Sequence, residues 1–384
     1  MAQYQTYLLY LTIFMDGLIL SLISIPRIIY IAKKRKLFDV PDNKRKLHLT
    51  ITPNIGGMGI FFGYIITIAL FIGPVNNPPE VYGFPQLHFI IASSFVLFLT
   101  GLYDDLASVN PYSKFTAQFM AAVITIYFAD IRLTSLHGLF GIYELSRWVS
   151  VIFSIVGCVF ITNAINLIDG IDGLAGSITV LCSLCLGLCL AASGNVGAAC
   201  VAISLMGATI GFLRFNKAPA KIFMGDSGSL FVGFNISILA ILSVNSYHAG
   251  SALSVVVHSE QPGSMLIVAL SILFVPVFDS FRVFINRARK GQSPFKADRT
   301  HLHHLLLDAG FTHSETVVIL LLSNVLLITV ALYMQDENPN IALATIVFVA
   351  MALFGILFYT RRKRLAKNQI YLEQKNAAPA VNEK

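Results

Sequence analysis

The chain alternates between long apolar runs that lack Asp, Glu, Lys and Arg and short segments that carry nearly all of its charge. A helix that crosses a bilayer needs roughly 20 mostly apolar residues, and several runs have that length. The run 173–213 is long enough for two helices, with a break near Gly194. With the shorter stretches 6–31 and 115–129, the pattern predicts about eleven transmembrane helices. The other runs are Leu47–Pro79, Val81–Tyr103, Trp148–Ile168, Ser227–Ser259, Gln261–Phe278, Thr316–Gln335 and Asn338–Thr360.

The composition supports the same fold class. Of the 384 residues, 56% are hydrophobic and only 12% are charged, and the mean hydropathy is +0.73. An ordinary soluble domain carries about 25% charged residues, so a large soluble core protein is excluded. We therefore expect an all-α, polytopic membrane protein with a single transmembrane catalytic domain over 1–362. The polar segment 363–384 is expected to be a cytoplasmic tail.

The positions of the basic residues predict the orientation in the membrane. Cytoplasmic loops of membrane proteins carry an excess of Lys and Arg. The N-terminus is therefore expected outside, and the C-terminal tail is expected in the cytoplasm. Most basic residues lie in the segments 33–46, 214–221, 282–299 and 361–367, whereas the loops 73–87, 244–264 and 335–340 contain none.

Under this topology, carboxylates from three loops lie at cytoplasmic helix ends, where ionisable groups are functional candidates by default. The first group, Gly101-Leu102-Tyr103-Asp104-Asp105, ends a helix. Adjacent helical residues point about 100° apart, so Asp104 and Asp105 are expected to have different tasks. One would face a cavity as a base or metal ligand, and the other would cap or orient. An acidic turn at the membrane interface is the alternative.

The second group places polar side chains at every third position: Asn163, Asn166, Asp169 and Asp172. A helical backbone would set them along one stripe. Buried amides need partners, which a cavity that holds a nucleotide would supply. A polar seam between packed helices is the alternative interpretation.

The third group runs from Asn216 through Lys221 to Asp226 in the segment Gly225-Asp226-Ser227-Gly228-Ser229. A glycine-rich turn that opens a helix exposes backbone N–H groups suited to phosphate. Lys221 suits phosphate as well. Asp226 suits Mg²⁺, which prefers few carboxylates and takes its remaining ligands from substrate oxygens and water.

The fourth group contains Arg299, His301, His303 and His304. Three histidines in four residues are compatible with zinc, but no cysteine lies nearby and the acids are hard ligands, so phosphate contacts are favoured. Lys46 and His48 are interpreted equally well as topology residues and as substrate contacts. Asp279 and Arg282, three residues apart, are expected to form a simple ion pair.

Between about Asp39 and Phe311, these motifs resemble, in matching order, the polyprenyl-phosphate N-acetylhexosamine-1-phosphate transferases of glycosyltransferase family 4. The first cytoplasmic loop is similar in Asp39-x-Pro41, Arg45-Lys46-x-His48 and Pro53-x-x-Gly56-Gly57. The three acidic groups resemble the acidic signatures of that family. His301-Leu302-His303-His304 is similar to the UDP-GlcNAc:undecaprenyl-phosphate transferases, whereas pentapeptide translocases have three consecutive histidines.

The resemblance implies a reaction in which undecaprenyl phosphate attacks the β-phosphorus of a UDP-N-acetylhexosamine and releases UMP. It implies that Asp104 or Asp105 deprotonates or orients the lipid phosphate, and that Asp226 and Asp169 hold Mg²⁺, with Mn²⁺ as the alternative. The amide and acid residues of the second group, with Asn216, would bind uridine or assist the metal. The histidines and Arg299 would stabilise charge on the diphosphate.

The same resemblance implies a multi-pass protein of the bacterial inner membrane that starts a cell-envelope polysaccharide. The expected partners are the UDP-sugar, undecaprenyl phosphate and the lipid bilayer, with no nucleic acid, and a homodimer is considered. A phospho-MurNAc-pentapeptide translocase is the alternative within the family. A membrane transporter is the alternative from another class, although its ionisable residues should cluster near the midplane.

Overall fold

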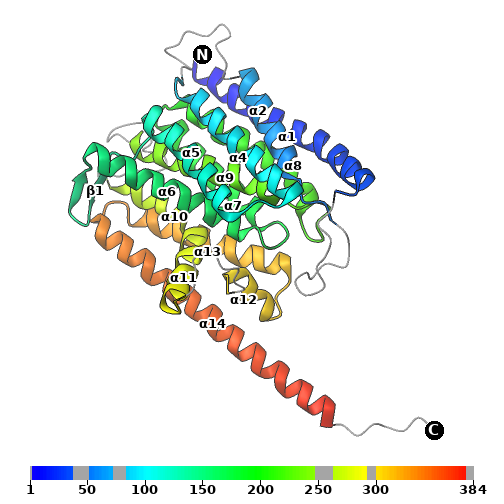
Figure 1. Cartoon of the computed structure of the whole chain (residues 1–384). Helices are drawn as coiled ribbons and strands as arrows, with labels where there is room; N and C mark the ends of the chain where they lie inside the picture. The colour runs from blue at the N-terminus through cyan, green and yellow to red at the C-terminus, as the bar shows by residue number, and fades with distance from the viewer. Residues whose placement is uncertain (1, 38–51, 72–83, 247–262, 292–299, 378–384) are drawn as a thin grey trace.

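The computed structural model describes residues 2–37, 52–71, 84–246, 263–291 and 300–377, and it is a helical bundle (Figure 1). The helices are α1 (Ala2–Arg35), α2 (Gly57–Phe71), α4 (Leu87–Ala107), α5 (Pro111–Val123), α6 (Arg147–Ile168), α7 (Leu174–Ala192), α8 (Val196–Asn216), α9 (Gly225–Asn245), α10 (Ser264–Ile272), α11 (Phe274–Arg289), α12 (Leu302–Asp308), α13 (His313–Tyr333) and α14 (Pro339–Ala377). A π-helical turn, η1 (Ile124–Phe128), extends α5.

The predicted class, an all-α multi-pass membrane protein, is confirmed. Among the described residues, eight helices are long and apolar enough to cross a membrane, or up to nine if α10 and α11, bent by 72°, form one span. Helix α2 is apolar but shorter. The exact number of spans, predicted as about eleven, and the domain boundary at 362/363 stay predictions.

Helix α9 forms the centre of the bundle. In its most apolar window 94% of the residues are buried, against 22% for α1 and for α14 at the periphery. Because α9 is covered on all sides, its polar Asn235 needs partners from neighbouring helices. The Tyr64 hydroxyl of α2 donates to the Asn235 side chain at 2.6 Å, and the Asn235 amide donates to the Ser94 hydroxyl of α4 at 2.8 Å.

Small residues let helices α2 and α4 approach the start of α9 closely. A Cβ atom placed on Gly101 would clash with the backbone of Asp226, and one on Gly57 would clash with Gly228. These contacts fix the end of α4, which carries Asp104 and Asp105, against the first turn of α9. The polar ends of the two helices therefore meet.

One small element departs from the all-α prediction. Strands β1 (Ser135–Leu139) and β2 (Ile142–Glu144) form an antiparallel hairpin in which Leu139 pairs with Ile142. Gly141 has a φ of +74° in the turn, a value that glycine adopts readily. The hairpin follows η1, and Figure 1 shows it at the edge of the bundle.

Candidate active site

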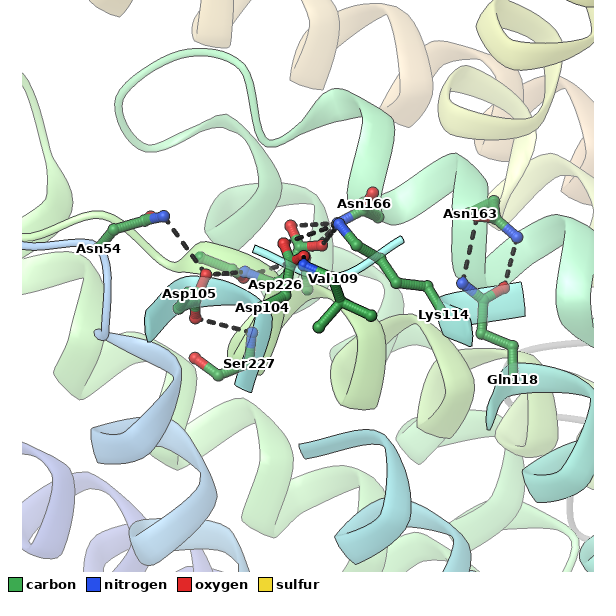
Figure 2. A network of polar contacts seen from close by, with 12 residues as sticks. Asn54, Asp104, Asp105, Val109, Lys114, Gln118, Asn163, Asn166, Asp226 and Ser227 are labelled. Atoms are coloured by element: carbon green, nitrogen blue, oxygen red, sulfur yellow. Dashed lines mark hydrogen bonds and ion pairs between the residues drawn. The ribbon is translucent and has the colours of Figure 1, made fainter. Parts of the chain in front are cut away.

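Helix α9 begins beside the acidic end of α4, and Asp105 caps it. The first backbone N–H groups of a helix have no partner inside it, and the preceding residue, Met224, makes no side-chain cap. The Asp105 carboxylate accepts hydrogen bonds from the backbone N–H of Asp226 at 2.8 Å and of Ser227 at 3.0 Å. The Asn54 amide donates to it at 3.3 Å. Asp105 thus positions Asp226 (Figure 2).

Asp104 points toward a different set of donors. Its carboxylate accepts from the Val109 backbone N–H at 2.6 Å and from the Lys114 ammonium at 2.7 Å. Lys114 also donates to Asp226 at 2.7 Å, so it bridges carboxylates of two helices (Figure 2). Burial alone would lower the pKa of Lys114, but the charges of Asp226 and Asp104 outweigh it and raise that pKa. The adjacent acids make different contacts, and their different tasks stay a prediction.

The two asparagines of α6 make different contacts, and Asn166 is the one that reaches Asp226. The Asn166 amide donates to Asp226 at 3.1 Å and to the Ser229 hydroxyl at 2.8 Å. One turn earlier, Asn163 pairs with Gln118 of α5, whose amide donates to it at 3.3 Å. The spacing of three residues therefore sets both amides on the side of α6 that faces α5 and α9, as Figure 2 shows.

Asp169 follows the last residue of α6 and lies at the centre of the acidic group. Its pKa is raised well above the ordinary value, first by burial and then by the negative charges of Asp226 and Asp105. A hydrogen bond with the backbone of Gly225 opposes this shift. Gly225 has a φ of +72°, and a Cβ there would clash with the Asn54 carbonyl, so only glycine fits this turn.

Asp172 and Asn216 are buried and join two loops. An oxygen of Asp172 accepts from the Ala220 backbone N–H at 3.0 Å. The Asn216 side chain accepts from the Gly173 N–H at 2.9 Å and donates to the Ile222 carbonyl at 2.9 Å. The two residues hold the α6–α7 loop against the α8–α9 loop. Lys221 is exposed in the second loop.

The histidines close the group from the α11–α12 side. His301 and His303 are buried, with 3% and 1% of their surface exposed. Both ring nitrogens of His303 lack a hydrogen-bond partner among the described residues, and a Cβ on Gly170 would clash with its Nε2. Burial, with the charge of His304 second, lowers the pKa of His303 to about 3, so its ring is neutral.

Asp279 does more than pair with Arg282. The predicted ion pair is present at 3.0 Å, but the buried Asp279 carboxylate also contacts His301 Nδ1 at 2.9 Å and accepts from the Leu302 N–H at 3.0 Å. The interpretation as a simple i,i+3 pair was therefore too narrow. A carboxylate on Nδ1 fixes the ring orientation and favours the tautomer that carries the proton there.

Some of these side chains line a cavity of about 760 Å³ between α5, α6, α11 and α12. Lys114, Asn163, Asn166, Asp169 and the three histidines contribute polar atoms. Gln118, Ser280 and Arg287 line it as well. Most of the other lining residues are apolar, and some of them are exposed on the outside of the bundle, among them Phe115, Phe119, Val156 and Phe284. Asp104, Asp105, Asp172, Asn216, Lys221 and Asp226 are not among the residues that line it.

Three predicted site residues, Lys46, His48 and Arg299, lie outside the described residues. Within the described ranges, no group of three or more His, Cys, Asp or Glu side chains is arranged to hold a metal ion.

Residues 87–244 match the model of a family described as glycosyl transferase family 4. The chain is 31% identical to the probable undecaprenyl-phosphate N-acetylglucosaminyl 1-phosphate transferase of Bacillus subtilis over 345 residues, 90% of each chain. It is 33% identical to the decaprenyl-phosphate N-acetylglucosaminephosphotransferase of Mycobacterium tuberculosis, over 73% of this chain and 71% of that protein. The chain belongs to glycosyl transferase family 4. The undecaprenyl-phosphate alpha-N-acetylglucosaminyl 1-phosphate transferase of Escherichia coli K12 is 28% identical over 85% of this chain and 84% of that protein.

As a member of glycosyl transferase family 4, the protein is a sugar-phosphate transferase, and the transporter alternative is wrong. The sequence analysis of this enzyme did not identify Lys114 as a site residue. Its signal was available: it is the sole charged residue between Asp105 and Asp130. Gln118, one helical turn later, was missed too, because its partner Asn163 lies on another helix.

Proposed function

We propose that this glycosyl transferase family 4 enzyme transfers N-acetylglucosamine 1-phosphate from UDP-N-acetylglucosamine to undecaprenyl phosphate. An oxygen of the lipid phosphate would attack the β-phosphorus. The bond from that phosphorus to the bridging oxygen would break, and UMP would leave with the bridging oxygen. The product would start a cell-envelope polysaccharide.

The observation that carries this proposal is the amphiphilic cavity. A polyprenyl phosphate needs a polar end for its phosphate and an apolar path for its chain. The 760 Å³ cavity combines both kinds of surface, since Lys114 and the histidines line it together with exposed apolar residues such as Phe119 and Val156. The names of the relatives, which specify polyprenyl-phosphate acceptors and N-acetylglucosamine, support the same substrates. The names of the relatives favour this activity over that of a pentapeptide translocase.

Lys114 and the histidines are proposed to reduce the repulsion between the two anionic substrates. Bringing phosphates together is opposed by charge, so catalysis of phosphoryl transfer depends on positioning and electrostatic stabilisation. Lys114 already lies between Asp104 and Asp226, so its ammonium can exchange a carboxylate for a phosphate oxygen. Asp104 would then be free to orient the acceptor. Because both oxygens of Asp105 accept backbone N–H groups, we assign Asp105 to positioning Asp226.

Mg²⁺ is proposed as the cofactor, with Mn²⁺ as the alternative, and the donor chemistry fits. Burial and the neighbouring charges of Asp226 and Asp105 raise the pKa of Asp169, so a cation beside these acids would relieve repulsion. Asp226 and Asp169 would hold the ion. Two carboxylates suffice because Mg²⁺ keeps water and takes phosphate oxygens as its other ligands. When bound, it would neutralise charge on the diphosphate.

The remaining predicted residues receive roles that follow their positions. Asn163 and Asn166 line the cavity and are proposed to contact the donor substrate. Asp172 and Asn216 are proposed to shape the nucleotide site by fixing its loops. Lys221 is proposed to contact phosphate. Lys46, His48 and Arg299 are proposed as further phosphate contacts from loops outside the described residues.

The proposal includes an orientation. We place the N-terminus outside, the acidic residues and the C-terminal tail in the cytoplasm, and the protein in the bacterial inner membrane. The reason is that cytoplasmic loops carry an excess of Lys and Arg, and most of these residues lie in the segments 33–46, 214–221, 282–299 and 361–367. Nucleotide sugars are cytoplasmic, so the site would face its donor. The homodimer stays a prediction.

The test is turnover by the purified full-length protein with UDP-N-acetylglucosamine, undecaprenyl phosphate and Mg²⁺. We expect UMP and a lipid-linked sugar diphosphate in equal amounts. Chelation of divalent cations should abolish turnover, and Asp226→Asn should lower it by about 10²-fold or more. Absence of UMP release from the folded wild-type protein, or full activity of Asp226→Asn, would refute the assignment. A panel of UDP-N-acetylhexosamines then identifies the sugar.

A further inference from the structure

A second cavity, separate from the candidate active site, lies between α1, α7, α8 and α13. Its volume is about 600 Å³, and it shares no lining residue with the cavity described above. We call it the α1/α8 groove. Most of its wall is apolar and comes from parts of transmembrane helices, with Leu18 and Leu22 of α1, Ile210 of α8 and Val318 of α13 among the lining residues. A bilayer lipid can therefore reach this surface along an apolar path.

One end of the groove is basic. Arg214, near the end of α8, and Lys217, just after it, both line the groove and are exposed. Among the described residues, neither side chain has an ion-pair partner within 4.0 Å. Two cations at a helix end, above an apolar channel, are complementary to a phosphate headgroup attached to hydrocarbon chains.

The one carboxylate in the groove does not cancel this charge. An oxygen of Asp172 accepts from the Ala220 backbone N–H at 3.0 Å and lies 3.5 Å from His313 Nδ1. It is held inside the loop structure, and only 4% of the Asp172 surface is exposed. The solvent-facing charge at this end of the groove therefore comes from Arg214 and Lys217.

From these observations we infer that the α1/α8 groove binds an anionic glycerophospholipid, with its phosphate on Arg214 and Lys217 and an acyl chain along α1 and α8. The acceptor lipid is a less suitable occupant, because the groove shares none of the polar residues, such as Asp169, the asparagines and the histidines, that line the first cavity. Zwitterionic lipids should bind more weakly, since their positive group opposes the two cations.

The groove is also formed in part by the α6–α7 loop, which carries Asp169. Asp172 and Gly173 line the groove, while Asp169 and Gly170, three residues earlier in the same loop, line the active-site cavity. A headgroup bound in the groove would thus lie behind this loop and support it. The lipid site is independent of the proposed transferase reaction, since its binding can be measured without turnover.

The experiment measures phosphatidylglycerol bound to the full-length protein in phosphatidylcholine nanodiscs that contain a small fraction of phosphatidylglycerol. The variants are Arg214→Gln/Lys217→Gln, which removes the charges, and Val318→Trp, which fills the groove from an exposed position. The matched control is Lys33→Gln/Lys34→Gln, which removes two exposed cations near the end of α1. Thermal unfolding of each variant checks the fold.

Each basic side chain near an anionic membrane contributes about a factor of five in affinity, so the charge variant, which lacks two, should bind phosphatidylglycerol about 25-fold more weakly. Val318→Trp should also lower the amount bound, and the control should resemble wild type. Wild-type binding by the charge variant, or equal loss in the control, would overturn the proposal. The proposal is also overturned if undecaprenyl phosphate displaces the bound lipid and excess phosphatidylglycerol does not.

Discussion

Replacement of Asp279 by asparagine tests whether the geometry of the histidine loop depends on one buried carboxylate. The substitution keeps the size and one acceptor oxygen but removes the negative charge. In the wild-type protein this carboxylate contacts His301 Nδ1 at 2.9 Å, the Leu302 N–H at 3.0 Å and Arg282 at 3.0 Å, with 2% of its side chain exposed. The Asn amide would present a donor toward one of these partners.

The expected magnitude follows from these contacts. A hydrogen bond to a charged group contributes about 1.5–3 kcal/mol and a neutral one about 0.5–1.5 kcal/mol, so three weakened bonds sum to about 3 kcal/mol. Because 23% of the Arg282 side chain is exposed, water replaces part of the interaction that Arg282 loses with Asp279. We expect Asp279→Asn to be about 2 kcal/mol less stable.

The effect on turnover should exceed the effect on stability. Without the carboxylate, the ring of His301 is no longer held in one orientation and tautomer, and a donor positioned at developing charge contributes about 10²- to 10³-fold to kcat. We expect kcat to fall by about 10²-fold with little change in KM for the UDP-sugar. The assay is UMP release by detergent-solubilised protein, with thermal unfolding measured in parallel.

The matched control is Asp308→Asn, an acid-to-amide change on α12. Its carboxylate lies 3.7 Å from Arg361 and 56% of its side chain is exposed, so kcat should stay near the wild-type value. The reasoning is refuted if folded Asp279→Asn turns over at the wild-type rate, or if both variants lose activity equally.

Three further predictions use the same assays. Lys114→Met should lower stability by about 1–2 kcal/mol and kcat by at least about tenfold, because two carboxylates lose a cation that is only a quarter exposed; unchanged unfolding and turnover would argue against the bridge. Gly170→Ala should lower kcat because its Cβ meets His303, and overpacking costs about 1–3 kcal/mol, whereas Gly157→Ala, which meets open space, should be neutral. Because burial lowers the pKa of His303 to about 3, below the unfolded value near 6.5, folding stability should decrease as pH falls from about 6.5 toward 3. His303→Asn should show a smaller loss of thermal stability over that interval, and an identical pH profile would contradict this reasoning.

The sequence alone predicted the fold class and the main groups of the candidate site. Many charge-free runs of roughly 20 residues indicate a bilayer, where helices satisfy their own backbone hydrogen bonds. Local patterns also indicated the amides of α6, since Asn163 and Asn166 share a helix face through their spacing. The two-residue acidic group likewise predicted different contacts for Asp104 and Asp105, because adjacent helical side chains diverge.

Only the tertiary structure decided which partner each of these side chains meets. Sequence spacing carries no information about contacts between distant helices, so it left Asp279 as a simple pair with Arg282 and left Lys114 without a role. In the folded chain, close approach at Gly101 brings the end of α4 to the start of α9, and there Asp105 caps Asp226 while Lys114 joins Asp104 to it. Residue types and their spacing along one helix can be read from the sequence, whereas burial and charge pairing depend on how separate helices pack.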